Sequence, residues 1–197
     1  CHFLPENKGK AEAVRLGMQY LMEMDIPYIG YFDADFSTPL HYIDIFTEQL
    51  ESTSSKYYMV MGSRVRRLGS EIKRKALRHV IGRTFATIAS YTLKMPVYDT
   101  QCGAKIFSTP FAKKVFKRKF LSKWLFDVEI IARSIIELGH SKTKKSILEY
   151  PLEEWKDDGN SRIKFIDTLI LPAALSKLHL AYHKKIKEIK QSENSHG

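Results

Sequence analysis

The stretch Tyr28–Asp35 (YIGYFDAD) decides the fold class of this 197-residue chain. Its first five residues are apolar strand formers that follow Pro27, and the acids Asp33 and Asp35 come directly after them. A short apolar run between a proline and an acidic turn is typical of a buried parallel strand. The two carboxylates are therefore expected beyond the carboxyl end of a strand, where open α/β sheets bind their ligands.

Helix and strand patterns alternate on both sides of this strand. Apolar residues at steps of three and four predict helices over residues 7–24 and 40–50, and residues 57–61 read as the next strand. The order strand, helix, strand predicts a right-handed crossover onto a parallel sheet. The later elements that we expect are a long basic helix over 72–93, a strand over 104–107, a helix over 126–138, a strand over 146–150, and a helix or helix pair over 161–190 interrupted at Pro172. The pattern predicts an α/β fold with a mostly parallel central sheet flanked by helices.

Composition and charge exclude several classes of protein. With 44% hydrophobic and 27% charged residues, the chain has the make-up of a folded domain. No apolar run approaches the ~20 residues of a membrane span. Two cysteines, Cys1 and Cys102, make no disulfide scaffold, which favours a reducing compartment and a cytoplasmic location.

The net charge of +10 is unevenly distributed along the chain. Residues 1–60 hold 9 acids and 4 bases, whereas residues 61–197 hold 13 acids and 28 bases. The segment 61–83 has a single acid, Glu71, and eight bases: Arg64, Arg66, Arg67, Lys73, Arg74, Lys75, Arg78 and Arg83. Such a surface attracts phosphates, anionic lipids or nucleic acid, or is simply well solvated.

Acidic and basic groups at the expected carboxyl edge of the sheet suggest phosphate and metal chemistry. Alternate carboxylates on a turn, as in Asp33 and Asp35, can converge on one hard cation such as Mg²⁺ or Mn²⁺. Upstream, residues 7–11 (NKGKA) place two lysines and a glycine at a helix start, where backbone N–H groups and positive charge suit a diphosphate. Arg64 follows the second strand in a Gly-Ser-Arg turn, and arginine forks bind phosphate oxygens in pairs.

Two further acidic positions remain open between structural and functional roles. Asp99 lies in a polar turn before a strand, where it is either a turn cap or a base that orients the acceptor. Asp127 and Glu129 lie on the first turn of an apolar helix, where acids stabilise the helix dipole or face the site.

Taken together and in order, these motifs resemble the family-2 glycosyltransferases of the GT-A fold. The motifs are residues 7–11 (NKGKA), 33–35 (DAD), 62–64 (GSR), 99–103 (DTQCG) and 126–129 (FDVE). The similarity is closest to the dolichyl-phosphate mannosyl- and glucosyltransferase branch, and it covers roughly residues 5–160. It implies a Rossmann-like nucleotide-sugar domain, a divalent metal at the D-x-D motif, and transfer of a hexose with inversion onto a polyprenyl phosphate.

The resemblance also implies a role for each motif. Asp33 would help to hold the nucleotide and the metal, Asp35 would be the principal metal ligand and act in catalysis, and Asp99 would be the acid near the reacting sugar. Arg64 and Arg78 match basic positions that contact phosphates of the acceptor or donor. The nucleotide-sugar-binding residues that it implies are Asn7, Lys8, Gly9, Lys10 and Asp33.

Two departures from the family pattern refine this expectation. Ser37 stands where the mannosyl branch often has a glutamine, which favours glucosyl-type or bacterial relatives. Family members also begin with nucleoside-binding strands, about 50–60 residues in all, that are not seen before Cys1. We therefore expect an N-terminally incomplete GT-A domain over 1–160 and a helical extension over 161–197.

Several alternatives stay open at this point. The donor is of the UDP-glucose or GDP-mannose type, and a sugar hydroxyl is an alternative acceptor, whose proton Asp99 would then accept. A non-catalytic basic module for membrane or nucleic acid is the second class, but the chain has no zinc-finger spacing or RNP-like signature, so we expect no nucleic-acid partner. The C-terminal residues 169–187 could also contact the inner face of a membrane peripherally.

Overall fold

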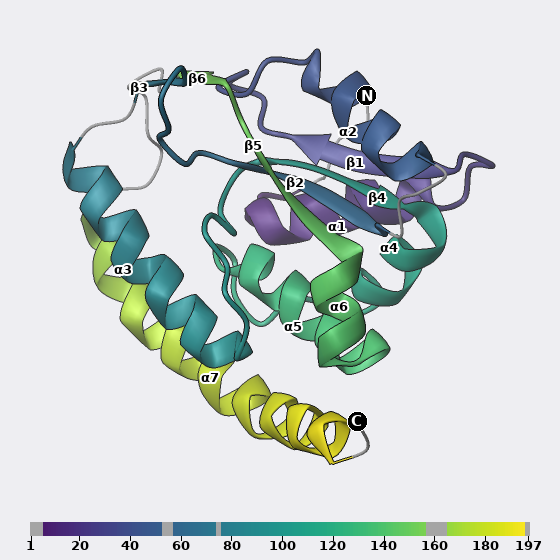
Figure 1. The fold of residues 1–197 in the computed structure, drawn as a ribbon, viewed down its shortest axis with the longest axis vertical. Coiled ribbons are helices and arrows are strands. Elements are labelled where there is room, and N and C mark those ends of the chain that lie inside the picture. Colours follow the sequence, from purple (N-terminus) through teal and green to yellow (C-terminus); the bar gives the residue numbers. More distant parts are fainter. Residues whose placement is uncertain (1–5, 53–56, 74–75, 157–164, 196–197) are drawn as a thin grey trace.

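The computed structural model describes residues 6–52, 57–73, 76–156 and 165–195 (Figure 1). In this part of the chain the helices are α1 (Lys10–Leu21), α2 (Tyr42–Glu51), α3 (Ala76–Leu93), α4 (Thr109–Val115), α5 (Phe126–Leu138), α6 (His140–Ser146) and α7 (Phe165–Asn194). The strands are β1 (Tyr28–Phe32), β2 (Met59–Ser63), β3 (Glu71–Lys73), β4 (Ala104–Ser108), β5 (Ile147–Pro151) and β6 (Glu154–Lys156).

The central sheet has four strands in the order β1-β4-β2-β5. β2 pairs with β5 in parallel, whereas β4 runs antiparallel to both of its neighbours, β1 and β2. Three of the four strands thus point the same way, and the expected mostly parallel α/β sheet with flanking helices is confirmed. Because β4 lies between β1 and β2, the crossover through α2 skips one position in the sheet.

The two faces of the sheet are buried by different helices, as the alternation of side chains along each strand requires. Met59, Met61 and Phe107 join the core on the side of α1, α4 and α5. Val60, Ala104 and Ile106 point to the opposite face and pack with α2. Figure 1 shows this layered arrangement, with α2 on one side of the sheet and α1, α4 and α5 on the other.

The predicted helix over 72–93 is wrong at its start. Residues Glu71–Lys73 form β3, which pairs in parallel with β6 in a second, two-stranded sheet, and α3 begins at Ala76. Ile72 is buried in the α2-side core together with Trp155 of β6. Tertiary burial of Ile72 therefore overrides the helical pattern at this end.

The C-terminal helix α7 continues through Pro172, where an interruption was expected. Leu175, Leu178 and Ile186 of α7 are buried in the core, and the helix lies alongside α3 (Figure 1). Among the described residues, none of the helices combines the length and apolar character that a membrane crossing requires.

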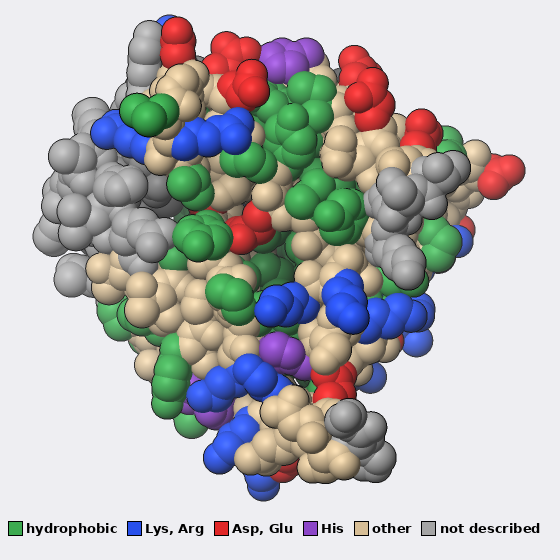
Figure 2. Space-filling model, viewed as in Figure 1, with side chains coloured by type: hydrophobic (Ala, Val, Ile, Leu, Met, Phe, Trp, Pro, Cys, Tyr) green, Lys and Arg blue, Asp and Glu red, His purple; other side chains and the backbone are tan. Residues whose placement is uncertain are grey.

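Charged side chains are unevenly distributed over the surface. In Figure 2, acidic side chains gather at the end of the molecule where α2 and β6 lie, and basic side chains gather over α6 and α7, with another basic group near β3.

Candidate active site

The turn after β1 meets the turn before β4 at one edge of the sheet. The backbone N–H of Asp33 donates to the carbonyl of Gly103 at 2.7 Å. A Cβ on Gly103 would overlap the carboxylate of Asp33, so the close approach requires glycine here. The D-x-D turn and the Asp99–Gly103 turn therefore form a single surface, as ligand binding beyond the strand ends would require.

The predicted helix start lies beside the first carboxylate of the D-x-D motif. Lys10, the first residue of α1, places its Nζ 2.7 Å from Oδ1 and 2.9 Å from Oδ2 of Asp33. Gly9 precedes it with a φ of 84°, and its N–H donates to Oδ1 of Asn7 at 3.0 Å. Lys8 is exposed next to them. The structure thus brings this segment and Asp33 together.

Asp35 is exposed on a strained turn. The N–H of Ser37 donates to its Oδ1 at 3.0 Å, and Phe36 between them has a φ of 53°, in the left-handed region that bulky residues seldom adopt. The Phe36 side chain is 64% exposed. Non-glycine residues in such conformations often mark functional turns, because the strain must be compensated by the rest of the fold.

Asp33 and Asp35 are the residues that would hold the divalent ion expected from the sequence. Within the described ranges, no three His, Cys, Asp or Glu side chains lie together as a ready metal cluster. Mg²⁺ in phosphate-transferring sites is usually held by one or two carboxylates plus substrate phosphates, and it retains several waters. Asp33 and Asp35 on one turn supply such a donor set.

Arg64 and Asp99 form a bidentate ion pair. Nε and one terminal nitrogen of Arg64 donate to the two carboxylate oxygens at 2.6 and 2.7 Å, and the backbone N–H of Arg64 donates to Oδ2 at 3.0 Å. Burial alone would lower the pKa of Arg64, but the charge and hydrogen bonds of Asp99 raise it above its usual value. The Arg64 guanidinium also lies 5.2 Å from the centre of the Trp155 ring.

The turn that contains Asp99 is anchored from β5. Glu149 accepts hydrogen bonds from the backbone N–H groups of Tyr98 and Asp99 at 2.9 to 3.0 Å. Burial raises the pKa of Glu149. The structure places Asp99 and Arg64 against each other, whereas the side chain of Arg78, on α3, lies outside the described residues.

Three buried polar atoms beside this pair have no hydrogen-bond partner in the described part of the chain. They are Ser63 Oγ, Thr100 Oγ1 and Gln101 Nε2. Such atoms cost free energy when unsatisfied, so natural proteins keep few of them and often keep them near functional sites. Ser63 directly precedes Arg64, and Thr100 and Gln101 are the two residues after Asp99.

A buried charged group that the sequence analysis missed lies behind the site. Lys105 of β4 contacts Asp127 at the start of α5, and Asp127 also accepts a hydrogen bond from Tyr31. A lysine inside the otherwise apolar strand AKIFS is the signal that could have found it, since buried lysines are rare unless paired.

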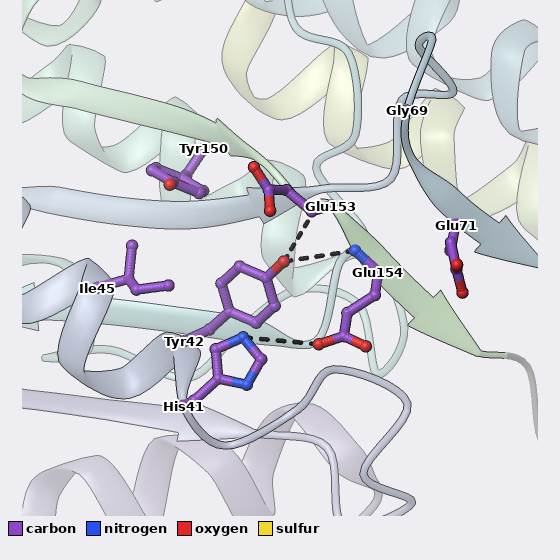
Figure 3. Close-up of a pocket in the computed structure, with 8 residues that line it drawn as sticks. All are labelled: His41, Tyr42, Ile45, Gly69, Glu71, Tyr150, Glu153 and Glu154. Atoms are coloured by element: carbon purple, nitrogen blue, oxygen red, sulfur yellow. Dashed lines mark hydrogen bonds and ion pairs between the residues drawn. The ribbon is translucent and has the colours of Figure 1, made fainter.

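A separate hollow of about 220 Å³ opens between α2, β3 and β6 (Figure 3). His41 lies 3.7 Å from Glu154, and the hydroxyl of Tyr42 accepts from the N–H groups of Glu153 and Glu154. Its lining contains none of the described residues that we predicted for the site. All three acids of its lining are exposed to solvent, and we assign the hollow no part in the chemistry.

Comparison with solved structures defines the class of fold. The chain superimposes on glucosyl-3-phosphoglycerate synthase from Mycobacterium tuberculosis in complex with UDP, with a TM-score of 0.57, 12% identity, and coverage of 89% of this chain and 57% of that one. For the complex with phosphoglyceric acid the TM-score is 0.59, with 13% identity and coverage of 92% and 57%. The fold is that of the GT-A glycosyltransferases, as the motifs predicted.

The curated relatives of this chain are dolichyl-phosphate β-glucosyltransferases, which confirms the predicted resemblance. The protein from Saccharomyces cerevisiae is 29% identical over 187 residues, covering 90% of this chain and 53% of its own length. Dolichyl-phosphate beta-glucosyltransferase ALG5C from Trichomonas vaginalis is 25% identical over 194 residues, with coverage of 97% and 55%. The chain thus spans about half the length of these relatives. No family model matches it.

Proposed function

We propose that this chain belongs to an inverting glycosyltransferase that moves glucose from UDP-glucose to dolichyl phosphate with the help of Mg²⁺ or Mn²⁺. The names of the relatives support glucose and dolichyl phosphate, and the UDP-bound structural neighbour supports a uridine donor. Ser37, which departs from the mannosyl pattern, also supports a glucosyl-type donor. The observation that carries the proposal is the convergence of Asp33, Lys10 and Gly103 beside Asp35 at one sheet edge.

The donor binds at the D-x-D edge. Asp35 and Asp33 would hold the cation, which when bound neutralises the charge that develops on the leaving diphosphate. Lys10 and Lys8, at the positive end of the α1 dipole, attract the same diphosphate. Asn7 and Gly9 shape the backbone of that helix start, where N–H groups can donate to phosphate oxygens.

The acceptor needs positioning more than deprotonation. A lipid phosphate is already anionic near neutral pH, so its oxygen can attack the sugar without a strong base. Asp99 is held by Arg64, which fixes the orientation of its carboxylate next to the reacting sugar. Arg64, together with Arg78, supplies positive charge for the acceptor phosphate.

The remaining parts of the chain serve this reaction. We assign residues 1–160 to the portion of the transferase domain that this chain contains, and residues 161–197, whose described part is α7, to a C-terminal extension. Because the acceptor is a membrane lipid, the protein makes peripheral contact with the membrane surface. The lysines over α6 and α7 favour an anionic surface (Figure 2).

Replacing Asp35 tests the proposed reaction. We expect D35N to lower metal-dependent transfer of glucose from UDP-glucose to dolichyl phosphate by at least ~100-fold, since charge stabilisation of the leaving group is lost. D44N, an exposed aspartate on α2, is the control and should retain activity. Transfer by D35N at the rate of D44N would refute the role of Asp35.

A further inference from the structure

The ammonium group of Lys105 is fully buried in the middle of the central sheet. In the register of the strands, Lys105 lies opposite Tyr31 of β1 and Met61 of β2. Its side chain shares the core face with Phe107, two residues further along β4. A buried charge is expensive unless it is paired and hydrogen-bonded, so the partners of Lys105 must explain its presence.

Those partners are a carboxylate and a backbone carbonyl. Nζ of Lys105 donates to Oδ1 of Asp127 at 2.5 Å and to the carbonyl of Cys102 at 2.5 Å. The hydroxyl of Tyr31 donates to the same Oδ1 at 2.6 Å. Burial, and then the negative charge of Asp127, raise the pKa of Tyr31 well above its usual value, so the phenol keeps its proton.

This buried group is connected to the D-x-D turn through one peptide. The carbonyl of Cys102 is held by Lys105, and the next carbonyl, of Gly103, accepts the N–H of Asp33 at 2.7 Å. On the other side, Nζ of Lys10 contacts Asp33 and lies 5.9 Å from the ring centre of Phe126, the neighbour of Asp127. Lys105 is therefore connected to Asp33 by two routes, one through the Cys102–Gly103 peptide and one through Asp127, Phe126 and Lys10.

We propose that Lys105, Asp127 and Tyr31 are positioning residues that hold the Cys102–Gly103 peptide and thereby fix Asp33 for the nucleotide-sugar donor. The proposal rests on the function proposed above, because it assigns Asp33 to the donor. In this proposal the three side chains act through the turn and not by contact with donor or acceptor. Catalysis depends on such placement because a displacement of about 1 Å can cost ~100-fold in rate.

Glu129, half a helical turn from Asp127 on α5, provides a matched control. Glu129 is also a buried acid on the first turn, and it also accepts from one cation, Arg133 at 2.8 Å, and one phenol, Tyr182 at 2.8 Å. This second group links α5 to α7 and to the N–H of Leu121, and it contacts neither Cys102 nor Asp33 in any described hydrogen bond. D127N and Y31F can therefore be compared with E129Q and Y182F.

The first arm measures catalysis. We expect D127N and Y31F to lower kcat/KM for UDP-glucose by ~10- to 100-fold, and E129Q and Y182F to change it by less than ~3-fold, at a temperature where urea titration shows all four variants folded. Losses that follow the free energy of unfolding in all four variants would overturn the proposal, because both groups would then be merely structural.

The second arm does not depend on activity. In a C1S background Cys102 is the sole thiol, and it is fully buried in the native protein. D127N and Y31F weaken the hold on Lys105, whose ammonium donates to the Cys102 carbonyl, and should thereby loosen the turn and raise the rate of labelling by dithiobis(nitrobenzoate) at least ~10-fold above that of E129Q and Y182F. Equal labelling rates in the two pairs overturn the proposal whatever the activities.

The activity and labelling measurements together distinguish a failure of the positioning role from a failure of the proposed function. If the unmodified chain transfers no glucose but Cys102 opens selectively in D127N and Y31F, the positioning role stands and the proposed function fails. If the chain transfers glucose and neither readout separates the two pairs, the proposed function stands and the positioning role fails.

Discussion

At the scale of single residues, the contact between Gly103 and Asp33 determines the geometry of the candidate site. Asp33 is held from two sides, by the carbonyl of Gly103 and by the ammonium of Lys10. Gly103 has no unusual φ, so it is the space beside the carboxylate, rather than backbone freedom, that excludes a larger residue.

We predict that G103A impairs the reaction more than the fold. The added Cβ displaces the Asp33 carboxylate, which is short and can swing toward solvent at a cost of about 1–2 kcal/mol in unfolding free energy. Glucose transfer should fall at least ~10-fold, because the donor site is displaced. Urea titration and initial rates on the same sample measure both effects. Full activity in G103A would show that the position of Asp33 is immaterial.

Sequence patterns located the acids and bases of this site but not their pairing. The D-x-D motif and the helix start at Lys10 could be placed at one sheet edge because both flank predictable elements. The bidentate contact of Arg64 with Asp99 joins residues far apart in sequence, and no local pattern encodes it. The burial of Lys105 was missed for the same reason, since its partner Asp127 lies on another element.

At the scale of elements, periodicity predicted most helices and strands, and tertiary contacts decided the rest. β1 and α5 have the predicted bounds because β1 is a short apolar run and the apolar residues of α5 recur at helical spacing. The antiparallel direction of β4 is set by its place between β1 and β2, which composition does not reveal. β3 forms because Ile72 is buried beside β6, and α4 and α6 are too short for their periodicity to be distinctive.

The end of α7 is fastened to the start of α6 by Glu193. Its carboxylate accepts the N–H groups of His140 and Ser141, each at 2.8 Å. Gly139 precedes them with a φ of 89° and leaves room for the carboxylate. Burial works in the opposite direction, but the hydrogen bonds from Ser141 and His140 prevail and lower the pKa of Glu193.

We predict a pH-dependent loss of stability in E193Q. A carboxyl whose pKa is lower in the folded than in the unfolded state stabilises the fold above the unfolded value of 4.5, and this contribution is lost as the pH falls through the folded pKa. E193Q should therefore cost roughly 0.5–1 kcal/mol near neutral pH and much less near pH 3. Urea titration at both pH values measures this, with the exposed E188Q as control. A difference that is the same at both values would contradict the assignment.

At the scale of the whole molecule, one sheet edge collects the groups that the proposed reaction needs. Asp33 directly follows β1 and Arg64 directly follows β2. The turn before β4 contains Asp99 and Gly103, which contact them at the same edge. The fold class was predictable because strand, helix and strand patterns alternate. The motif resemblance also indicated a polyprenyl-phosphate acceptor, and it left the donor open between the UDP-glucose and GDP-mannose types because the side chains that recognise a sugar come from several elements.

The most direct test of the account is the transfer of labelled glucose from UDP-glucose to dolichyl phosphate, with GDP-mannose as the competing donor and a chelator to remove the metal. The account predicts metal-dependent glucosyl transfer that exceeds mannosyl transfer at least ~10-fold. Mannosyl transfer at an equal or higher rate, or glucosyl transfer unaffected by the chelator, would contradict it.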